Sequence, residues 1–456
     1  MARHYHKSIP EPGNGTTNVP AGTPPPGDLL LTAIQTFLGA CRRPAVLEYG
    51  DAPQPLVPGE YALELRSGKL WIEIWTETRS LSRRILSVER HSTGVLDCTI
   101  QRFGGQPGSL SFLDLDRPQA AHKKLCGIRQ NFTEQFRRML FRQFPGWEIS
   151  ALTCSMDLRR SFSAIYPRAR LLRGNQQIAA VACPAFEDEP ALLTAALIWL
   201  DHVRTHSPQG VETSFSLFLP DNAGTLTAHR LRWLTGGLLA PSSGERSSGA
   251  PLSGPRLFRF NAHGSAGEVD PYDLGNLDTR VSATASHPQS VSVPVGFSFS
   301  ERCLESTVRS NLAIVDPTLV PSPVHAQVLT FAATDRDLID LLAVSLSGRL
   351  AVIELKVSED LHLPMQALDY WMRIRWHAQR GELQHFFPAV PLDSAPPKLL
   401  LVAPAMSFHS TNSIVLRYFS PEIEVERVGI NSDWQQHLKV VMRLQGAAVP
   451  ISHGGS

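Results

Sequence analysis

A nearly continuous apolar run that carries two opposite charges most constrains the fold of this chain: LAVIELKV, at residues 350–357. Such a run of β-branched and aliphatic residues is typical of a strand that is covered on both faces. Because side chains alternate along a strand, Glu354 and Lys356 share one face with Val352. Burying a carboxylate and an ammonium is costly unless they pair or bind a metal. The sequence therefore predicts a buried strand that ends in a polar site.

A turn at Ser347-Gly348 joins this strand to the preceding run, IDLLAVSL, so the two runs are predicted to form a hairpin. The hairpin returns Asp340 to the neighbourhood of Glu354. These two carboxylates supply hard oxygen ligands for Mg²⁺ or Mn²⁺, and such a metal polarises phosphoryl oxygens and activates water. The ammonium of Lys356 can stabilise developing negative charge or orient the water. This set suits metal-assisted phosphodiester hydrolysis.

The segment that follows the strand, LPMQALDYWMRIRWHAQRG, is predicted to be a helix. Pro364 fits the first turn of that helix. Gln366 and Tyr370 are four residues apart in the sequence, so they lie on one helical face. We expect this face to reach Lys356 or a phosphate of the substrate.

Taken in order, the set Asp340, Glu354-x-Lys356 and Gln366-x-x-x-Tyr370 resembles the PD-(D/E)xK nuclease superfamily, in its RecB-like and NucS-like branch. The resemblance implies a restriction-endonuclease-like αβββαβ core. It gives the metal-ligand roles to Asp340 and Glu354, and the catalytic-lysine role to Lys356. The helix motif of the family falls on Gln366 and Tyr370. An isolated Glu-x-Lys pair carries little information, whereas this ordered set in a strand, hairpin and helix context is specific.

The resemblance covers roughly residues 298–444 and departs from the family pattern at one place, where Ile339 stands for the proline of the family name. The family accepts residues other than proline at that position. Such enzymes often add a glutamate from the preceding core helix, and SERCLESTVRSNL offers Glu301 and Glu305 one turn apart. We assign this role to Glu305, with Glu301 as the alternative. For either residue, the competing interpretation is a solvated helix surface.

These patterns predict a mixed α/β protein that acts as a Mg²⁺-dependent endo- or exonuclease on DNA, in repair or in defence against foreign DNA. Other interpretations stay open. Glu354 and Lys356 could form a structural ion pair at the end of a sheet. The chain could instead be a non-catalytic nucleic-acid-binding or scaffolding protein with a nuclease-like fold. A further alternative is that the N-terminal half docks a protein partner while the nuclease domain is vestigial.

Length and composition limit the class of protein. A chain of 456 residues with 43% hydrophobic and 19% charged residues is typical of a globular protein of several domains. A formal net charge of +1 gives no overall attraction to nucleic acid, so any basic surface must be local. The six cysteines form no Cys-x-x-Cys pair, which favours reduced thiols in the cytoplasm. No apolar run approaches the roughly 20 residues that span a bilayer, so no membrane partner is expected.

Composition also divides the chain into regions. Residues 28–43 predict an amphipathic helix at the start of the first ordered region. In order along the sequence, the expected regions are a disordered tail (1–27), a strand-rich region (28–116), a basic α/β module (117–240), a Gly/Ser/Pro-rich linker (241–295), the nuclease-like domain (296–445) and a second tail (446–456).

Residues 117–173 are rich in arginine and lysine and contain few acidic residues. A local excess of this kind can follow a phosphate backbone. The alternative is a solvated helix face with intramolecular ion pairs. The residues that we expect to bind nucleic acid are Arg137, Arg138, Arg142 and Arg168.

The predicted elements of residues 131–235 repeat the order found in the nuclease-like domain: helix, hairpin, helix, strand and helix. Trp199 can be aligned with Trp371 without gaps. Our hypothesis is an internal duplication whose first copy lost its catalytic residues, and the alternative is chance recurrence of a common α/β order. The alignment places Arg168 on Asp340, Ala182 on Glu354, Pro184 on Lys356, Thr194 on Gln366 and Ile198 on Tyr370.

Overall fold

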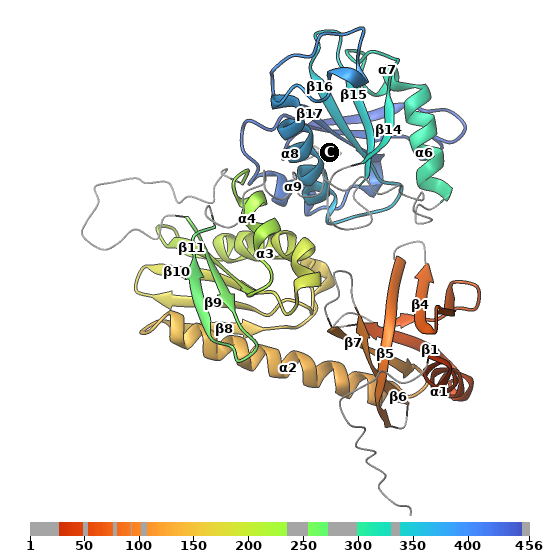
Figure 1. The fold of residues 1–456 in the computed structure, drawn as a ribbon. Coiled ribbons are helices and arrows are strands. Elements are labelled where there is room, and N and C mark those ends of the chain that lie inside the picture. Colours follow the sequence, from red (N-terminus) through yellow and green to blue (C-terminus); the bar gives the residue numbers. More distant parts are fainter. Residues whose placement is uncertain are drawn as a thin grey trace, which may run out of the picture.

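The computed structural model describes most of the chain, and within the described residues the fold is mixed α/β with three separate sheets (Figure 1). The expected terminal tails lie outside this part except for residues 27 and 446–448. None of the helices in the described residues combines the length and apolar character that a membrane crossing requires. The described residues are 27–48, 53–75, 80–92, 94–101, 107–234, 254–271, 299–329 and 338–448.

The N-terminal domain is a seven-stranded antiparallel sheet in the order β2-β1-β7-β6-β5-β4-β3. Helix α1 (Gly27–Ala40) packs its buried residues Leu30, Ile34 and Phe37 into the core of this sheet. The helix ends earlier than expected because Pro44 already begins the first strand. The strands are β1 (Pro44–Glu48), β2 (Gln54–Pro55), β3 (Tyr61–Arg66), β4 (Lys69–Trp75), β5 (Ser80–Ser92), β6 (Val95–Gln101) and β7 (Pro107–Asp114).

The first α/β module begins with the long helix α2 (Pro118–Gln143), which contacts both β7 of the N-terminal sheet and β8 of its own sheet. The sheet order is β13-β12-β11-β10-β9-β8. Helices α3 and α4 cover one face of this sheet, and α2 covers the other. The remaining elements are β8 (Glu148–Thr153), β9 (Arg168–Arg173), β10 (Gln176–Ala182), α3 (Glu189–Thr205), β11 (Glu212–Pro220), α4 (Thr225–Leu231), β12 (Pro255–Phe260) and β13 (Ala266–Val269).

The linker predicted over residues 241–295 is wrong for its described part. Residues 254–271 contain β12 and β13, which complete the first six-stranded sheet. The short strand PRLFRF buries Leu257, Phe258 and Phe260 on the two faces of that sheet. The first module therefore extends to residue 271, beyond the boundary at 240 that composition indicated.

The second α/β module forms another six-stranded sheet, in the order β14-β15-β16-β17-β18-β19. Helices α8 and α9 cover one face, and α6 and α7 cover the other. This module contains the hairpin and helix that the sequence predicted around residues 339–379. Its elements are α6 (Phe299–Ser310), α7 (Leu312–Val315), β14 (His325–Leu329), β15 (Leu338–Val344), β16 (Leu350–Leu355), α8 (Leu363–Gln379), β17 (Lys398–Pro404), α9 (Asn412–Leu416), β18 (Val425–Ile430) and β19 (Val440–Gln445).

The two modules share one topology. In each sheet the first three strands are antiparallel to their neighbours, the next two steps are parallel, and the last step is antiparallel. In each module one helix follows the third strand and a shorter helix follows the fourth. The duplication hypothesis required the central strands to superpose, and this common order and direction meets the topological part of that requirement.

Strand pairing fixes which residues of the two modules correspond. Pro220 and Pro404 each end the fourth strand, and their partners, Phe260 and Ile430, each end the fifth. Phe218 and Val402 lie at the same distance before these two prolines. Phe218 pairs with Ala182 in the first module, and Val402 pairs with Leu355 in the second. Ala182 therefore corresponds to Leu355, so the alignment based on the two tryptophans is displaced by one residue in this strand.

The side-chain faces support the corrected register. Val181 and Val352 both lie in the core beneath α3 and α8, whereas Ala182 packs into the core beneath α2. The tryptophans themselves are not equivalent. The indole of Trp199 donates to the carbonyl of Ala169 in β9, whereas that of Trp371 donates to Pro397, just before β17.

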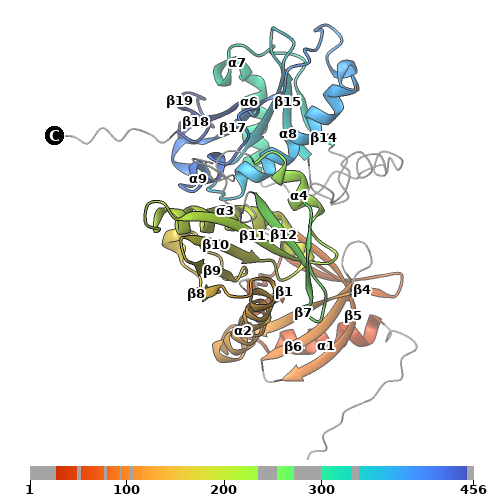
Figure 2. The same ribbon diagram turned by 90° about the vertical axis from the view of Figure 1, so that its left-hand side faces the viewer.

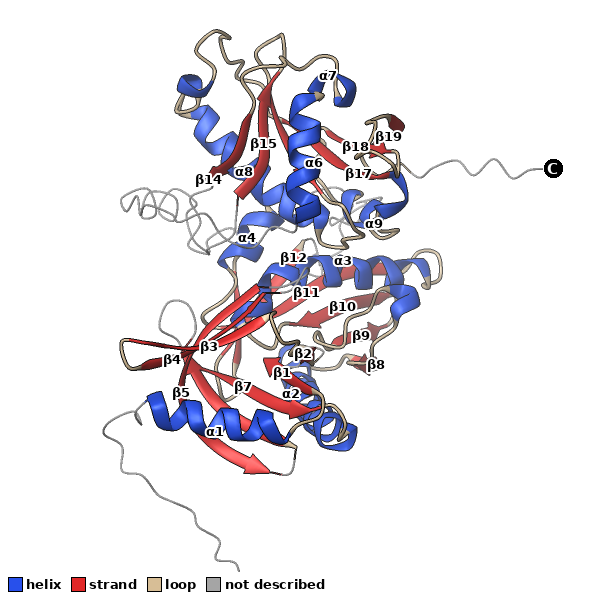
Figure 3. Ribbon diagram, turned by 90° about the vertical axis from the view of Figure 1, so that its right-hand side faces the viewer, coloured by secondary structure: helices blue, strands red, loops and turns tan. Residues whose placement is uncertain are grey.

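The modules pack against each other through their equivalent helices. Figures 2 and 3 show α3, α4, α8 and α9 between the two sheets. Buried residues from both modules form one continuous apolar core there. Within it, Arg230 of α4 makes a two-point ion pair with Asp369 of α8, at 2.8 Å for Nε–Oδ1 and 2.7 Å for Nη2–Oδ2. Trp233, which follows α4, meets Trp371 edge to face at 4.9 Å between ring centroids.

Candidate active site

Strand β16 carries the charged pair as its sequence pattern predicted. Leu350 and Val352 face the core beneath α8, while Ile353 and Leu355 face the core beneath α6. Glu354 belongs to the first of these faces by alternation, and only 2% of it is exposed. A carboxylate is thus held at the end of a central strand that is covered on both sides.

The hairpin brings Asp340 to the same place. Leu341 of β15 pairs with Ile353 of β16, so Asp340 lies opposite Glu354 one step further along the ladder. The Oδ2 atom of Asp340 accepts a hydrogen bond of 2.7 Å from the backbone N–H of Leu355, and the residue is 7% exposed. The position of this carboxylate is therefore set by the backbone of the neighbouring strand β16.

Lys356 completes the charged group. Its Nζ lies 3.6 Å from Oε1 of Glu354 and 3.8 Å from Oδ2 of Asp360. Burial lowers the pKa of Lys356, but Glu354, Asp360 and Asp340 outweigh that effect, so the pKa is raised and the side chain stays an ammonium. The backbone N–H of Lys356 donates to Val402 of the neighbouring strand, which fixes the root of the side chain.

Burial dominates the electrostatics of the two carboxylates. It raises the pKa of Asp340 to about 7, against the opposing effects of the Leu355 hydrogen bond and the charge of Lys356. It also raises the pKa of Glu354, and the neighbouring charge of Asp340 adds to that rise. Two buried acids that oppose each other's ionisation are stabilised by a further cation at the site.

The donor atoms suit a divalent cation. The Oε2 atom of Glu354 is buried and has no hydrogen-bond partner within the described residues. No group of three or more His, Cys, Asp or Glu side chains in the described residues is arranged to hold a metal ion. Asp340 and Glu354 supply two carboxylates at opposed positions of the paired strands, and Mg²⁺ commonly takes one or two protein carboxylates and fills its other positions with water or phosphate oxygens. The residues therefore fit Mg²⁺ or Mn²⁺.

Helix α8 lies over β16 and carries the predicted helix motif. The Oε1 atom of Gln366 is buried and has no hydrogen-bond partner in the part of the chain that the structure describes. Tyr370 is 8% exposed and belongs to the apolar core shared by the two modules. Gln366 therefore keeps an unused polar atom for a ligand, whereas Tyr370 contributes mainly to packing.

Helix α6 supplies the expected acidic residues. The charges of Glu301 and Glu305 both raise the pKa of Asp340, and Glu301 has the larger effect. Glu301 also raises the pKa of Lys356. Both carboxylates are therefore acidic neighbours of the site, and the choice of Glu305 over Glu301 stays a prediction.

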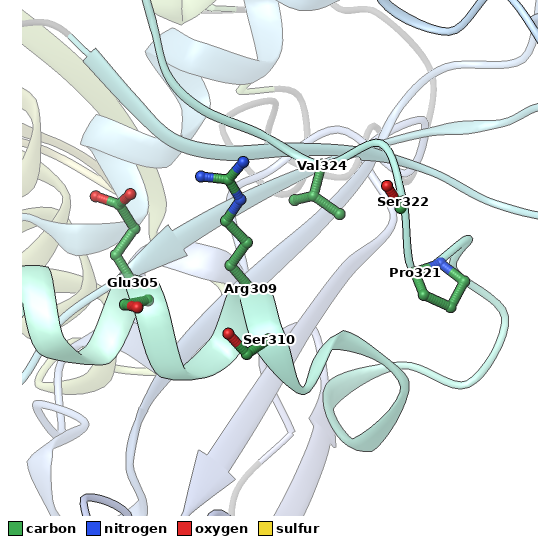
Figure 4. A pocket seen from close by; sticks show the side chains of 7 residues that line it. Glu305, Arg309, Ser310, Pro321, Ser322 and Val324 are labelled. Carbon is green, nitrogen blue, oxygen red and sulfur yellow. The ribbon is translucent and has the colours of Figure 1, made fainter.

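Glu305 also lines a cavity of about 460 Å³ between α6 and the segment that leads into β14. Figure 4 shows its carboxylate and the guanidinium of Arg309 rising from the same side of the helix. The two side chains are one helical turn apart and carry opposite charges. Glu305 therefore lies near both the charged site and this polar cavity.

The sequence analysis missed three polar residues near the site. Asp360 contacts Lys356, and its Oδ1 accepts from the backbone N–H of His362 at 2.7 Å. The side-chain nitrogen of Asn412, in α9, donates to the carbonyl of Asp360 at 3.2 Å. Asp360 follows Glu354 closely in the segment ELKVSED, so its closeness in the sequence could have identified it as part of the site. Nothing in the sequence around Asn412 pointed to such a role.

The corresponding place in the first module is chemically different. In the strand register of the first module, Arg168 occupies the position equivalent to Asp340, Val181 that of Glu354 and Cys183 that of Lys356. Because α3 and α8 each carry proline near their first turn, Leu192 and Ala196 stand for Gln366 and Tyr370. Each of the five positions has lost the group that the second module retains.

Arg168 is not the nucleic-acid contact that the sequence analysis expected. It is 5% exposed, and its guanidinium donates to the carbonyls of Ser155 and Ser163 at 2.6 and 3.1 Å. The guanidinium also lies over the rings of Phe162 and Trp199, at 4.4 and 5.7 Å from their centroids. A buried cation thus replaces the carboxylate, which excludes a second metal site of the same kind.

The other predicted basic residues lie on α2. Arg137 pairs with Glu134 on the same helix at 3.1 Å, as the alternative of intramolecular pairing proposed. Arg138 and Arg142 are exposed and stand one turn apart on that helix. A phosphate-binding role therefore remains a hypothesis for Arg138 and Arg142 above all.

Comparison of the chain with protein-family models, with curated proteins and with solved structures finds no match.

Proposed function

We propose that the second module is a metal-dependent nuclease centre of the PD-(D/E)xK kind and that its substrate is DNA. The observation that carries the proposal is the buried pair Asp340 and Glu354 with Lys356 beside it. Holding two carboxylates in an apolar sheet opposes folding, because each must be desolvated and each repels the other. A catalytic metal site gives this arrangement a purpose that a simple ion pair does not.

Each residue has a distinct task in this proposal. Asp340 and Glu354 would hold Mg²⁺ or Mn²⁺, which when bound supplies Lewis-acid polarisation of the phosphate and a more acidic water. Lys356 places a fixed positive charge where negative charge develops on the phosphoryl oxygens. Gln366 offers a buried carbonyl oxygen that can orient a water molecule. Tyr370 holds α8 against β16, so that the strand and the helix keep one geometry.

The proposed substrate and cellular role rest on the resemblance rather than on a contact in the fold. DNA is the usual substrate of the superfamily that the ordered motif resembles, and repair or defence is the corresponding expectation. The alternative of a non-catalytic nucleic-acid-binding protein keeps the fold but leaves the desolvated carboxylates of Asp340 and Glu354 without a role. The chemistry of the site therefore favours cleavage.

A cleavage assay on the full-length protein tests the proposal. Labelled single-stranded, duplex and branched DNA would be incubated with and without Mg²⁺, and a matching RNA would report on substrate class. We expect cleavage of at least one DNA substrate that requires the metal and is absent in Glu354→Gln. Metal-independent products, or equal products from Glu354→Gln, would assign the activity to a contaminant and overturn the proposal.

A further inference from the structure

The contacts between the two modules run in both directions, because in each module the segment after the fourth strand touches the other module's helix after the third strand. Trp233, at the end of the α4 segment, packs on Trp371 of α8. In the opposite direction, Tyr418, at the end of the α9 segment, lies under the guanidinium of Arg204 of α3, 5.9 Å from its ring centroid. In a two-fold interface each half presents the same patch to the other. Here equivalent helices of the two modules meet, although the individual residue contacts differ.

This internal interface uses the helical face that a separate second module would leave open. The buried residues of α3, α8 and α9 belong to one apolar core. The backbone N–H of Ser420 donates to the carbonyl of Trp233 at 2.7 Å, and Arg417 pairs with Asp201 of α3 at 3.3 Å. Because the first module already covers this face, a second copy of the chain cannot pair through it.

Only one half of the pair keeps the charged residues. The second module has Asp340, Glu354 and Lys356, whereas the first has buried Arg168, Val181 and Cys183 at the same positions of the same topology. In a symmetric dimer two centres would act on the two strands of a duplex. This chain has the symmetric frame but a single centre.

From this asymmetry, and resting on the function proposed above, we infer that the protein is a one-centre pseudo-dimer that nicks duplex DNA. It packs two modules of one topology through equivalent helices, much as dimeric DNA-binding proteins pair two subunits across the two backbones of a duplex. In one binding event, the oxygen of one water molecule attacks one phosphorus and one P–O ester bond breaks. The leaving oxygen takes up a proton, which gives a hydroxyl end and a phosphate-monoester end on one strand.

The test follows the cleavage of supercoiled plasmid DNA by the full-length protein with Mg²⁺, resolved on an agarose gel over time. We expect nicked circles to accumulate first, with linear DNA appearing only later through independent nicks. Lys356→Ala should remove the nicked product, and its counterpart variant Cys183→Ala should retain it. Light scattering at the assay concentration should show a monomer.

The outcomes separate this inference from the proposed function. Linear DNA that appears without a nicked intermediate would overturn the pseudo-dimer inference and leave the nuclease in place, as would a dimer in light scattering that makes paired cuts. Cleavage of single-stranded DNA with an untouched plasmid would overturn the choice of a duplex substrate. Absence of cleavage on every DNA tested would overturn the nuclease itself, and the inference with it.

Discussion

The two α/β modules show how far one frame can be kept while its chemistry changes. Both sheets have the same order of strand directions. In each module, the helices that follow the third and fourth strands cover one face of the sheet. At the end of the third strand, however, one module buries Glu354 and the other buries Val181. The fold depends on the alternation of apolar residues and on where the strands end, and neither changes when valine stands in place of glutamate. The charged site depends on a few polar side chains, so the same exchange removes it.

The difference also appears in energetics. In the first module, Arg168 has hydrogen bonds to two carbonyls and stacks on two rings, so its burial is partly compensated within the fold, although its Nε atom has no hydrogen-bond partner within the described residues. In the second module, the carboxylates of Asp340 and Glu354 have raised pKa values, and one oxygen of Glu354 has no hydrogen-bond partner within the described residues. Under the duplication hypothesis, loss of the site in the first copy would have removed this repulsion between two buried carboxylates.

The largest expected effect is on cleavage. Lys356→Ala should reduce the rate by about 10²–10³-fold or more, because it removes a positive charge aimed at the developing charge of the phosphate. Its counterpart in the first module, Cys183→Ala, should leave the rate unchanged. Both variants would be measured in single-turnover assays after circular dichroism shows that they are folded. Equal losses in the two variants would remove the proposed distinction between the modules.

The second prediction breaks the contact between the modules. Asp369→Ala leaves the guanidinium of Arg230 buried without its carboxylate, which should destabilise the protein by about 3–5 kcal/mol. Glu134→Ala, which breaks the exposed pair with Arg137, should cost about 0–1 kcal/mol. Urea denaturation gives both values. If the first variant is no less stable than the second, the modules are not joined by this ion pair.

A third prediction concerns a charged cluster found in the second module only. Lys398 lies 2.8 Å from Asp316 and 2.7 Å from Glu426, whereas strand register places Ser214 and Arg256 at the positions of Lys398 and Glu426. Burial raises the pKa of both acids, but the hydrogen bonds and charge of Lys398, together with the hydrogen bonds of Thr318 to Asp316 and the hydrogen bond and charge of Arg443 at Glu426, outweigh it, so both pKa values are lowered.

A lowered carboxylate pKa adds stability above the unfolded-state value, and that stability is lost as the pH falls through the folded-state value. At pH 7, Lys398→Met should therefore cost about 1–3 kcal/mol, since it removes hydrogen bonds to charged groups. At a pH below the lowered folded-state pKa values of both acids the cost should shrink, because both acids are then protonated in the parent as well. Urea midpoints at the two pH values provide the measurement. A cost that is independent of pH would show that the cluster acts through packing alone.

The smallest expected effect is on DNA binding by the first module. Charge reversal in Arg138→Glu combined with Arg142→Glu should weaken binding several-fold and equally for different sequences, because phosphate contacts carry no base information. Each lost phosphate contact should reduce the slope of log affinity against log salt by about 1. Arg42→Glu combined with Arg43→Glu makes the same change of charge at two exposed arginines of the N-terminal domain and is the matched control. Equal effects of the control and the α2 variant would leave α2 without a role in binding.

The central hairpin and the helix after it could be predicted because their signals are local. Alternation in residues 350–357 fixed which side chains share a face, and Pro364 marked the start of α8 within one residue. The repeat of element order was visible for the same reason. Asp340 and Glu354 could be paired because a hairpin has few alternative registers once its turn is known.

What could not be predicted depends on contacts that are distant in the sequence. β12 lies in a region that is rich in Gly, Ser and Pro, and only its pairing with β11 and β13 shows that it is a strand. The correspondence of Ala182 with Glu354 was wrong because Trp199 and Trp371, which anchored the alignment, bond to different parts of their sheets. Asn412 entered the site through the packing of α9.

The apolar core that both modules share has a consequence for synthesis of the chain on the ribosome. Helices α3 and α4 are made well before α8 and α9, which must cover them. During that interval the growing chain exposes the apolar face that ends at Trp233, and exposed apolar surface of this kind favours aggregation. We therefore expect the nascent first module to need a chaperone, and truncations that separate the modules to be insoluble.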